Sequence, residues 1–116
     1  MSQGIELLVF PVKDIARAKV LYGNLLGAEP YVDEAYYVGF RIGGLEVGLD
    51  PHGHDQGQTG PIAYSSVEDI GARLQVMVDS GARVELDVRD VGGGKLMARL
   101  RDADDNVVGL LQQPAG

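Results

Sequence analysis

The chain has 116 residues, a net charge of -7, 45% apolar residues and no cysteine. This length supports one hydrophobic core, and the composition is that of a folded globular protein. The acidic balance excludes the usual basis for binding nucleic acids or anionic membrane surfaces, since both need clustered Lys and Arg. Without cysteine there are no disulfides or thiolate sites, and without a basic leader or long apolar run we expect a cytoplasmic protein.

One pattern occurs twice along the chain. The segments IELLVFPVKDIARAKVLYGNLLGAEP and PIAYSSVEDIGARLQVMVDSGARVEL each give an apolar strand, the motif Val-x-Asp-Ile, an amphipathic stretch and Gly-Ala. Asp14 and Asp69 stand just before apolar residues at helical spacing, where they are suited to cap a first turn. Gly27 and Gly81 are placed to end the helices. The predicted helices run over Asp14–Leu26 and Asp69–Ser80.

Three short β-like runs follow each predicted helix. They cover 29–33, 36–42 and 45–50 in the first copy, and 83–88, 95–101 and 106–112 in the second. The repeated unit is therefore βαβββ. We expect a single domain over residues 1–116, with module 1 at about 4–50, a connector at 51–60 and module 2 at about 61–113. The connector, PHGHDQGQTG, is polar and rich in Gly, which is typical of a flexible segment.

The dipeptide Gly43-Gly44 predicts a type I′ hairpin turn, which places Gly39 opposite Gly48. One face of the hairpin is then apolar and packs under a helix: Val38, Phe40, Ile42, Leu45, Val47 and Leu49. The other face is mixed and is expected to line a groove: Tyr37, Gly39, Arg41, Glu46, Gly48 and Asp50. In the second copy the same alternation gives the groove face Val107, Gly109 and Leu111.

The repeat, the helix starts VKDI and VEDI, and the ending DADDNVVGLLQ together resemble the vicinal oxygen chelate superfamily. This superfamily contains glyoxalase I, extradiol dioxygenases, and the fosfomycin and bleomycin resistance proteins. The likeness runs from about Ile5 to Gln113. It implies an α+β fold in which two tandem βαβββ modules form a cupped, incomplete barrel, and it implies a homodimer.

In metal-dependent members of that superfamily the metal ligands lie on the concave face. Matched position by position, these places fall on Leu7, Gly48, Ile62 and Gly109. None of the four offers the lone-pair donor that a divalent cation needs. We therefore expect no metal or other cofactor, and the two glycines are expected to leave room for a ligand. A register slip of one residue would bring in Glu6 or Glu46, but it would also turn the neighbouring apolar set outward.

The candidate ligand-binding residues are those expected on the groove face: Leu7, Val9, Tyr37, Gly39, Arg41, Glu46, Gly48, Ile62, Tyr64, Ser66, Arg99, Gly109 and Leu111. Tyr37 and Tyr64 suit stacking on a flat ligand, and Arg41 suits an anionic or carbonyl group. Each has a plainer alternative. The tyrosines could serve packing, Arg41 could pair with Glu46, and the two arginines of KLMARLRD could face solvent.

Three further motifs have structural interpretations. His52 and His54 are the only histidines, and they fall in the connector, where no rigid element orients them as metal ligands. The run DADDN lacks the later Glu and the Gly of an EF-hand, so it predicts a tight turn held by Asx hydrogen bonds. The run VGGGK at 91–95 predicts a flexible loop over the groove.

Three functions follow from these patterns. The first is a binding protein that holds a small aromatic or amphiphilic molecule without a metal, as the bleomycin resistance proteins sequester a drug. The second is a metal-dependent lyase, isomerase or dioxygenase with the unusual ligands Glu46, His52 and Asp50. The third is a structural or regulatory dimer whose groove is plugged by Tyr37, Tyr64 and Leu111.

Overall fold

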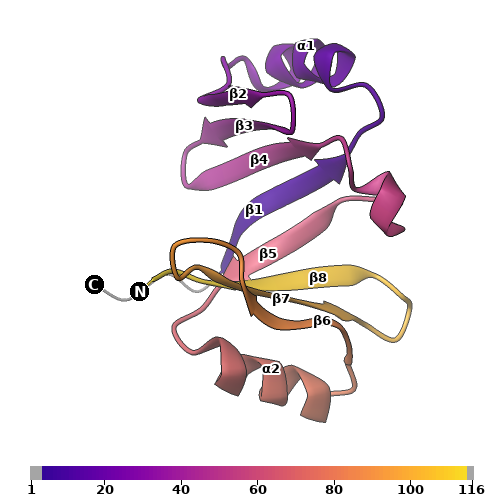
Figure 1. The fold of residues 1–116 in the computed structure, drawn as a ribbon, viewed down its shortest axis with the longest axis vertical. Coiled ribbons are helices and arrows are strands. Elements are labelled where there is room, and N and C mark those ends of the chain that lie inside the picture. Colours follow the sequence, from indigo (N-terminus) through magenta and orange to yellow (C-terminus); the bar gives the residue numbers. More distant parts are fainter. Residues whose placement is uncertain (1–3, 115–116) are drawn as a thin grey trace. The chain divides into compact units, whose positions relative to one another are not determined.

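The structure, a computed structural model, describes residues 4–114 and has the α+β composition predicted from the sequence (Figure 1). Its elements are β1 (Gly4–Pro11), α1 (Ile15–Leu26), β2 (Val32–Glu34), β3 (Tyr37–Ile42), β4 (Leu45–Asp50), a 3-10 helix (His54–Gln56), β5 (Ile62–Ser66), α2 (Ile70–Asp79), β6 (Arg83–Asp90), β7 (Leu96–Arg101) and β8 (Val107–Gln112). The repeated βαβββ pattern is confirmed. The chain forms two compact units, one over Glu6–Ile62 and one from Ala63 onward that also includes Gly4 and Ile5.

Both helices begin at the aspartates that the sequence indicates. The Asp14 carboxylate accepts a hydrogen bond from the backbone N–H of Arg17 at 3.0 Å, and Asp69 accepts one from Ala72 at 3.0 Å. Each bond satisfies one of the donors that a first helical turn leaves open, and such a cap is worth about 1 kcal/mol. Helix α1 ends at Gly27, which has the left-handed conformation with φ 64°.

The first unit has the strand order β2-β3-β4-β1, with β1 parallel to β4 and the other neighbours antiparallel. All five pairs in the β3–β4 register agree with the prediction, including Gly39 opposite Gly48 and Arg41 opposite Glu46. The turn itself differs from the expected type I′. Only Gly43 has positive φ, at 59°, which is the pattern of a type II′ turn.

The apolar face of this hairpin packs under α1, as predicted. Its buried core consists of Ala18, Val38, Phe40, Val47 and Leu49. Phe40 and Leu49 have no exposed surface. Burying a side chain of this size contributes about 1.5–3 kcal/mol, so the hydrophobic contacts fix which sheet face turns away from the helix. Ile42 belongs to the predicted set but is 36% exposed, since it lies at the hairpin end.

The second unit repeats this construction with the strand order β5-β8-β7-β6. Strands β5 and β8 are parallel, while β8, β7 and β6 are antiparallel, and the β6–β7 register shifts twice. The core under α2 consists of Val67, Ile70, Ala98, Leu100 and Leu110. The face away from α2 therefore carries the residues that alternate with these along β7 and β8.

The connector at 51–60 is more ordered than the sequence suggests. It contains the 3-10 helix, whose turns are closed by backbone hydrogen bonds from Gln56 and Gln58 to the Gly53 carbonyl, each at 3.0 Å. Gln58 is buried, with 5% of its surface exposed. A β-carbon at Gly53 would stand 2.7 Å from Cβ of Pro11, so this glycine allows the segment to pack closely against the end of β1. The connector is therefore hydrogen-bonded and packed against the end of β1, which the sequence did not indicate.

The run 91–95 forms a turn in which Val91 donates to the Lys95 carbonyl at 2.8 Å, and Gly92, Gly93 and Gly94 all have positive φ. Such backbone angles favour glycine, which explains the run of three.

Neither of the two helices described between residues 4 and 114 is long and apolar enough to cross a membrane.

Candidate functional site

The sheet face opposite α1 carries the first group of predicted site residues. Pairing in β3 and β4 brings Gly39, Arg41, Glu46 and Gly48 together, and β1 adds Leu7 beside Glu46 and Val9 beside Gly48. Glu46 thus shares this face with Gly48 in the predicted register. This agrees with the predicted groove face, because residues two apart on a strand point to the same side, and no register slip is needed.

The space above Gly48 is occupied by the phenol ring of Tyr37. A β-carbon at Gly48 would stand 2.2 Å from the Tyr37 hydroxyl oxygen and 2.6 Å from ring carbons Cε1 and Cζ. The neighbouring Gly39 is similarly covered, since its β-carbon would stand 3.0 Å from Tyr37 and 3.2 Å from Tyr31. The room that we expected above this glycine is therefore filled by an aromatic ring of the same sheet.

Glu46 is the centre of a polar cluster on this face. Tyr31 donates a hydrogen bond from its hydroxyl to Oε1 of Glu46 at 2.5 Å, and Tyr37 donates to Oε2 at 2.6 Å. The Arg41 guanidinium lies 4.2 Å from the centre of the Tyr31 ring and 3.8 Å from Oε1 of Glu46. We call these four residues the Glu46 cluster. It combines a carboxylate with two phenol donors and a cation stacked on an aromatic ring.

The cluster is partly open to solvent. Tyr31 is 47% exposed as a residue, and the side chains of Arg41 and Glu46 are 62% and 22% exposed. Because a mostly exposed ion pair contributes little, the hydrogen bonds of the two phenols hold Glu46 more firmly than Arg41 does. Arg41 can therefore leave Tyr31 at small cost, which would uncover one face of that ring.

The two phenols of the cluster have raised pKa values. Burial is the largest cause for Tyr37, followed by its hydrogen bond to Glu46 and the negative charge of Glu46, and together they place the pKa well above 10.0. Burial and Glu46 also raise the pKa of Tyr31, while nearby Arg41 lowers it in part. Both hydroxyls therefore remain protonated donors at neutral pH.

Tyr31 is a site residue that the strand pattern missed. It precedes β2, and its backbone N–H donates to the Gly39 carbonyl at 2.9 Å, which brings its ring over the face of β3 and β4. The sequence places Tyr31 in a run of β-like residues, but a three-residue strand at a sheet edge has too few alternating positions to fix its face. The one indication in the sequence that Tyr31 belongs to the site is its position just before the hairpin in which Gly39 lies opposite Gly48.

The sheet face opposite α2 carries the second group. Tyr64 pairs with Gly109 and Ser66 with Leu111 along β5 and β8, and Ile62 alternates with them on β5. A β-carbon at Gly109 would stand 2.1 Å from Cδ1 and 2.2 Å from Cε1 of Tyr64. Tyr64 and Leu111 are each only 3% exposed. Each unit therefore places a tyrosine ring over its glycine, from β3 in the first unit and from β5 in the second.

Arg99 lies on this second face, opposite Gly109. It donates to the Tyr64 hydroxyl at 3.4 Å and contacts the Met97 sulfur at 3.7 Å. Its Nε atom is buried without a hydrogen-bond partner among the residues that the structure describes. An unsatisfied buried N–H costs about 1–3 kcal/mol, so the position of this arginine is not explained by stability.

The residues at the four superfamily metal positions do not fit a divalent cation. Leu7, Gly48, Ile62 and Gly109 have no donor atoms, and tyrosine rings cover the two glycines. Within residues 4–114 no group of three or more His, Asp or Glu side chains is arranged to hold a metal ion. The alternative ligand set of Glu46, His52 and Asp50 is therefore not brought together. Asp50 instead accepts a hydrogen bond from the His52 backbone N–H at 2.8 Å.

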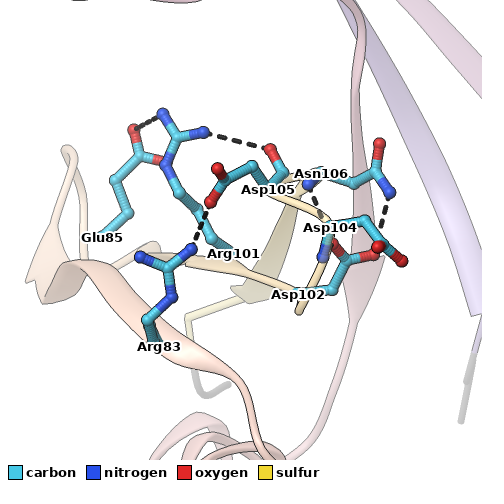
Figure 2. A network of polar contacts seen from close by, with 7 residues as sticks. All are labelled: Arg83, Glu85, Arg101, Asp102, Asp104, Asp105 and Asn106. Carbon is cyan, nitrogen blue, oxygen red and sulfur yellow. Dashed lines mark hydrogen bonds and ion pairs between the residues drawn. The ribbon is translucent and has the colours of Figure 1, made fainter.

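The acidic run before β8 is a structural turn, as predicted (Figure 2). Oδ1 of Asp102 accepts from the backbone N–H of Asp104 and of Asn106, each at 2.9 Å, and Oδ2 accepts from the Asn106 amide at 3.0 Å. These bonds lower the pKa of Asp102. Arg83 pairs with the Asp105 side chain, and Arg101 donates to the Asp105 carbonyl at 3.1 Å. Arginines of β6 and β7 thus both contact Asp105 of this turn.

Solved structures share this fold at low sequence identity. A protein named as an NAD-dependent benzaldehyde dehydrogenase from Legionella pneumophila is 18% identical, with a TM-score of 0.75 over 91% of this chain and 96% of that chain. A glyoxalase/bleomycin resistance protein/dioxygenase superfamily member from Vibrio splendidus 12B01 is 16% identical, with a TM-score of 0.72 over 96% and 98%. Methylmalonyl-CoA epimerase from Mycobacterium tuberculosis is 16% identical, with a TM-score of 0.64 over 97% and 89%. These similarities show the fold alone, since different activities share one fold.

Sequence comparison identifies the family more directly. No match was found among curated proteins. The sequence model named Glyoxalase/Bleomycin resistance protein/Dioxygenase superfamily, however, matches residues 4–110, which is nearly the whole chain. The resemblance inferred from the repeat and the helix starts is thereby confirmed, and the chain belongs to the glyoxalase/bleomycin resistance protein/dioxygenase superfamily.

Proposed function

We propose that this protein binds a small aromatic or amphiphilic molecule, without the metal ion of its catalytic relatives, on the sheet face opposite α1. The observation that carries this proposal is the Glu46 cluster, which presents an exposed ring, an exposed cation and a carboxylate on one partly open face. Aromatic surfaces with a few placed polar groups are typical of small-molecule sites.

The cluster suggests how a ligand is held. A flat ring can take the place of Arg41 on the face of Tyr31, which is 47% exposed. Arg41, once displaced, can pair with an anionic or carbonyl group on the same ligand, because its planar guanidinium suits both. Glu46 fixes the two tyrosines, so that the binding surface is formed before the ligand arrives. Such preorganisation lowers the entropic cost of binding.

A second candidate function is the purely structural or regulatory one. Tyr64 and Leu111 fill the second face to 3% exposure each, and Tyr37 covers Gly48. These two observations support the third possibility from the sequence, in which Tyr37, Tyr64 and Leu111 occupy the space expected for a ligand. It differs from the first proposal in one measurable respect, because a filled face predicts that no small molecule stabilises the protein.

The metal-dependent alternative has less support. Glu46 is the one carboxylate among the predicted site residues, and both of its oxygens accept hydrogen bonds from phenols. A metal ion at Glu46 would have to displace both donors and recruit ligands that the cluster does not contain. Calorimetric titration of chelator-treated protein with nickel, manganese, cobalt and zinc tests this alternative. Stoichiometric micromolar binding that Glu46→Gln abolishes would contradict the proposal.

The experiment for the main proposal is a thermal-shift screen over aromatic acids, 2-oxo aldehydes and antibiotics. A ligand that binds only the folded protein raises the unfolding temperature by mass action. Tyr31→Ala is expected to abolish the shift, while Tyr36→Ala is the matched control, since Tyr36 is 64% exposed and adjoins the same hairpin. If no compound shifts the wild type, or if Tyr31→Ala keeps the full shift, the proposal fails.

Three further properties belong to this proposal. The protein forms a homodimer, which light scattering during gel filtration measures directly. It acts in the cytoplasm, in keeping with a chain that has no cysteine. Its ligand is bound without chemical change, as in drug sequestration. Quantitative recovery of the intact ligand after incubation supports this point, and conversion of the ligand would contradict it.

A further inference from the structure

Arg99 is a half-buried arginine on the face opposite α2 whose neighbours do not explain its charge. It pairs with Gly109 on β8, which has no side chain, and with Leu86 on β6, which is apolar. Its contacts are the neutral hydroxyl of Tyr64 at 3.4 Å and the neutral sulfur of Met97 at 3.7 Å. Within residues 4–114 it makes no ion pair, and its buried Nε has no acceptor.

Two neighbouring arginines, Arg101 and Arg83, have acidic partners. Arg101, two residues further along β7, pairs with Glu85 at 3.5 Å and donates to the Asp105 carbonyl at 3.1 Å (Figure 2). Arg83 pairs with the Asp105 side chain. A partly buried cation normally has a counter-charge, because burial without one is costly. Among residues 4–114, Arg83 and Arg101 thus have acidic partners, whereas Arg99 has none.

We infer that Arg99 binds the carboxylate group of a small organic acid. The edge of a guanidinium formed by Nε and one terminal nitrogen matches the two oxygens of a carboxylate. At Arg99 the Nε side of this edge is the unsatisfied one, while the other terminal nitrogen, Nη1, is turned to Tyr64. The inference concerns the second unit alone and does not depend on which ligand the Glu46 cluster takes.

The surroundings favour an organic acid over a polyanion. Met97 is half-buried and apolar on the same face, which suits the carbon skeleton of a ligand, and Tyr64 and Leu111 are buried beside it, so a ligand reaches Arg99 only by displacing part of this packing. A nucleic acid or anionic membrane would need several cations in a row, whereas the protein carries a net charge of -7 and the adjacent arginines are already paired.

The test is a nuclear magnetic resonance titration of the isotope-labelled protein with benzoate. Saturable shifts of the Tyr64, Gly109 and Leu111 amides are expected for the wild type. Arg99→Lys keeps the charge but loses the planar edge, and is expected to bind roughly tenfold more weakly or worse. Arg101→Lys is the matched control on the same strand and face, and should keep the wild-type affinity. Benzamide, which has the same shape without the charge, should give no shifts.

Several outcomes would overturn the inference, three of them in this titration. The first is the absence of saturable shifts, the second is unchanged affinity in Arg99→Lys, and the third is equal binding of benzamide. Binding of inorganic sulfate without benzoate would also overturn it, because the site would then serve a free oxyanion. A second measurement checks Arg99 without a ligand. Arg99→Met removes an uncompensated charge, so its unfolding temperature in buffer without organic acids is expected to equal or exceed that of the wild type. A large decrease would show a structural role instead.

Discussion

The phenol ring of Tyr37 lies directly over Gly48, so close that a β-carbon at Gly48 would stand 2.2 Å from the tyrosine hydroxyl oxygen. This contact joins a fold requirement to a binding surface. The glycine admits the ring, the ring presents its hydroxyl to Glu46, and Glu46 in turn holds Tyr31. A glycine that looks like a weak point in a strand therefore sets the position of the whole Glu46 cluster.

Replacement of Gly48 by alanine tests this relationship. Gly48→Ala must push the Tyr37 ring away from the sheet and break its hydrogen bond to Glu46, so the free energy of unfolding should fall by about 1–3 kcal/mol. Gly44→Ala, in the same hairpin, is the control, because its β-carbon would meet nothing within 4 Å. Urea unfolding measures both. The double variant Gly48→Ala/Tyr37→Ala should lose less free energy of unfolding than the sum of the losses in the two single variants, because the clash is gone once the ring is removed. A double variant whose loss equals that sum would argue against the contact.

The corresponding glycine of the second unit should be less tolerant. At Gly109 the added carbon would stand 2.1 Å from Cδ1 of Tyr64, near the root of a ring that is only 3% exposed. Since Tyr64 has no open space to move into, Gly109→Ala is expected to cost about 2–4 kcal/mol, more than Gly48→Ala. Gly60→Ala serves as the control, because nothing lies within 4 Å of its β-carbon. Equal losses at Gly48 and Gly109 in thermal unfolding would show that burial of the ring does not matter.

The sequence was most informative where local chemistry decides the structure. The aspartates before each helix and the Gly43-Gly44 pair lead directly to the observed caps and to all five pairs of the β3–β4 register. Alternation along a strand then assigns each residue to a face, because the apolar set must pack under a helix. The assignment of Arg41, Glu46 and the glycines to one face follows from these steps.

The features that the sequence did not reveal depend on side-chain direction. Alternation places Tyr37 and Gly48 on one face, but only the rotamer of the tyrosine decides whether the space above the glycine is open or filled. The same holds for Tyr64 over Gly109. Arg99 was recognisable as a residue of this face, whereas its lack of a counter-charge is visible only once Glu85 is seen to pair with Arg101. Local sequence patterns thus predict the fold and the sheet face on which each residue lies. They do not predict how the side chains on that face pack or pair with one another.

The raised pKa of Tyr37 predicts a dependence of stability on alkaline pH. The phenol has an ordinary pKa of 10.0, which applies to the unfolded chain, and the folded pKa lies well above it. The protonated folded state is therefore fully favoured below about pH 10, and this contribution is lost as the pH rises towards the folded pKa. Urea unfolding at about pH 8 and about pH 11 should show a smaller loss of stability in Tyr37→Phe than in the wild type. Identical losses in the two proteins would mean that folding does not raise the pKa of Tyr37.

Glu46→Gln tests the centre of the cluster. The amide offers one acceptor oxygen where the carboxylate offers two, so one phenol loses its partner and the protein should lose about 1–2 kcal/mol of stability. The substitution also removes the negative charge that raises the pKa of Tyr31 and Tyr37, so both should ionise at lower pH. Ultraviolet titration of tyrosinate measures this second effect. Glu34→Gln, at an exposed position of β2, should change neither property.

The turn before β8 allows a comparison between adjacent aspartates. Asp102 accepts three hydrogen bonds from Asp104 and Asn106, whereas the Asp104 side chain accepts none from the residues between 4 and 114. Asp102→Ala should therefore lower the unfolding temperature by a few degrees, and Asp104→Ala should leave it close to the wild-type value. The hydrogen bonds to Asp102, above all the one from the Asn106 side chain, lower its pKa, so its contribution to stability depends on pH. Because the folded pKa lies below the unfolded value of 3.8, the contribution is present above about pH 4 and disappears as the pH falls through the folded pKa. The gap between the two variants should consequently narrow in acid, and a gap that stays constant would show that the carboxylate charge is not what holds the turn.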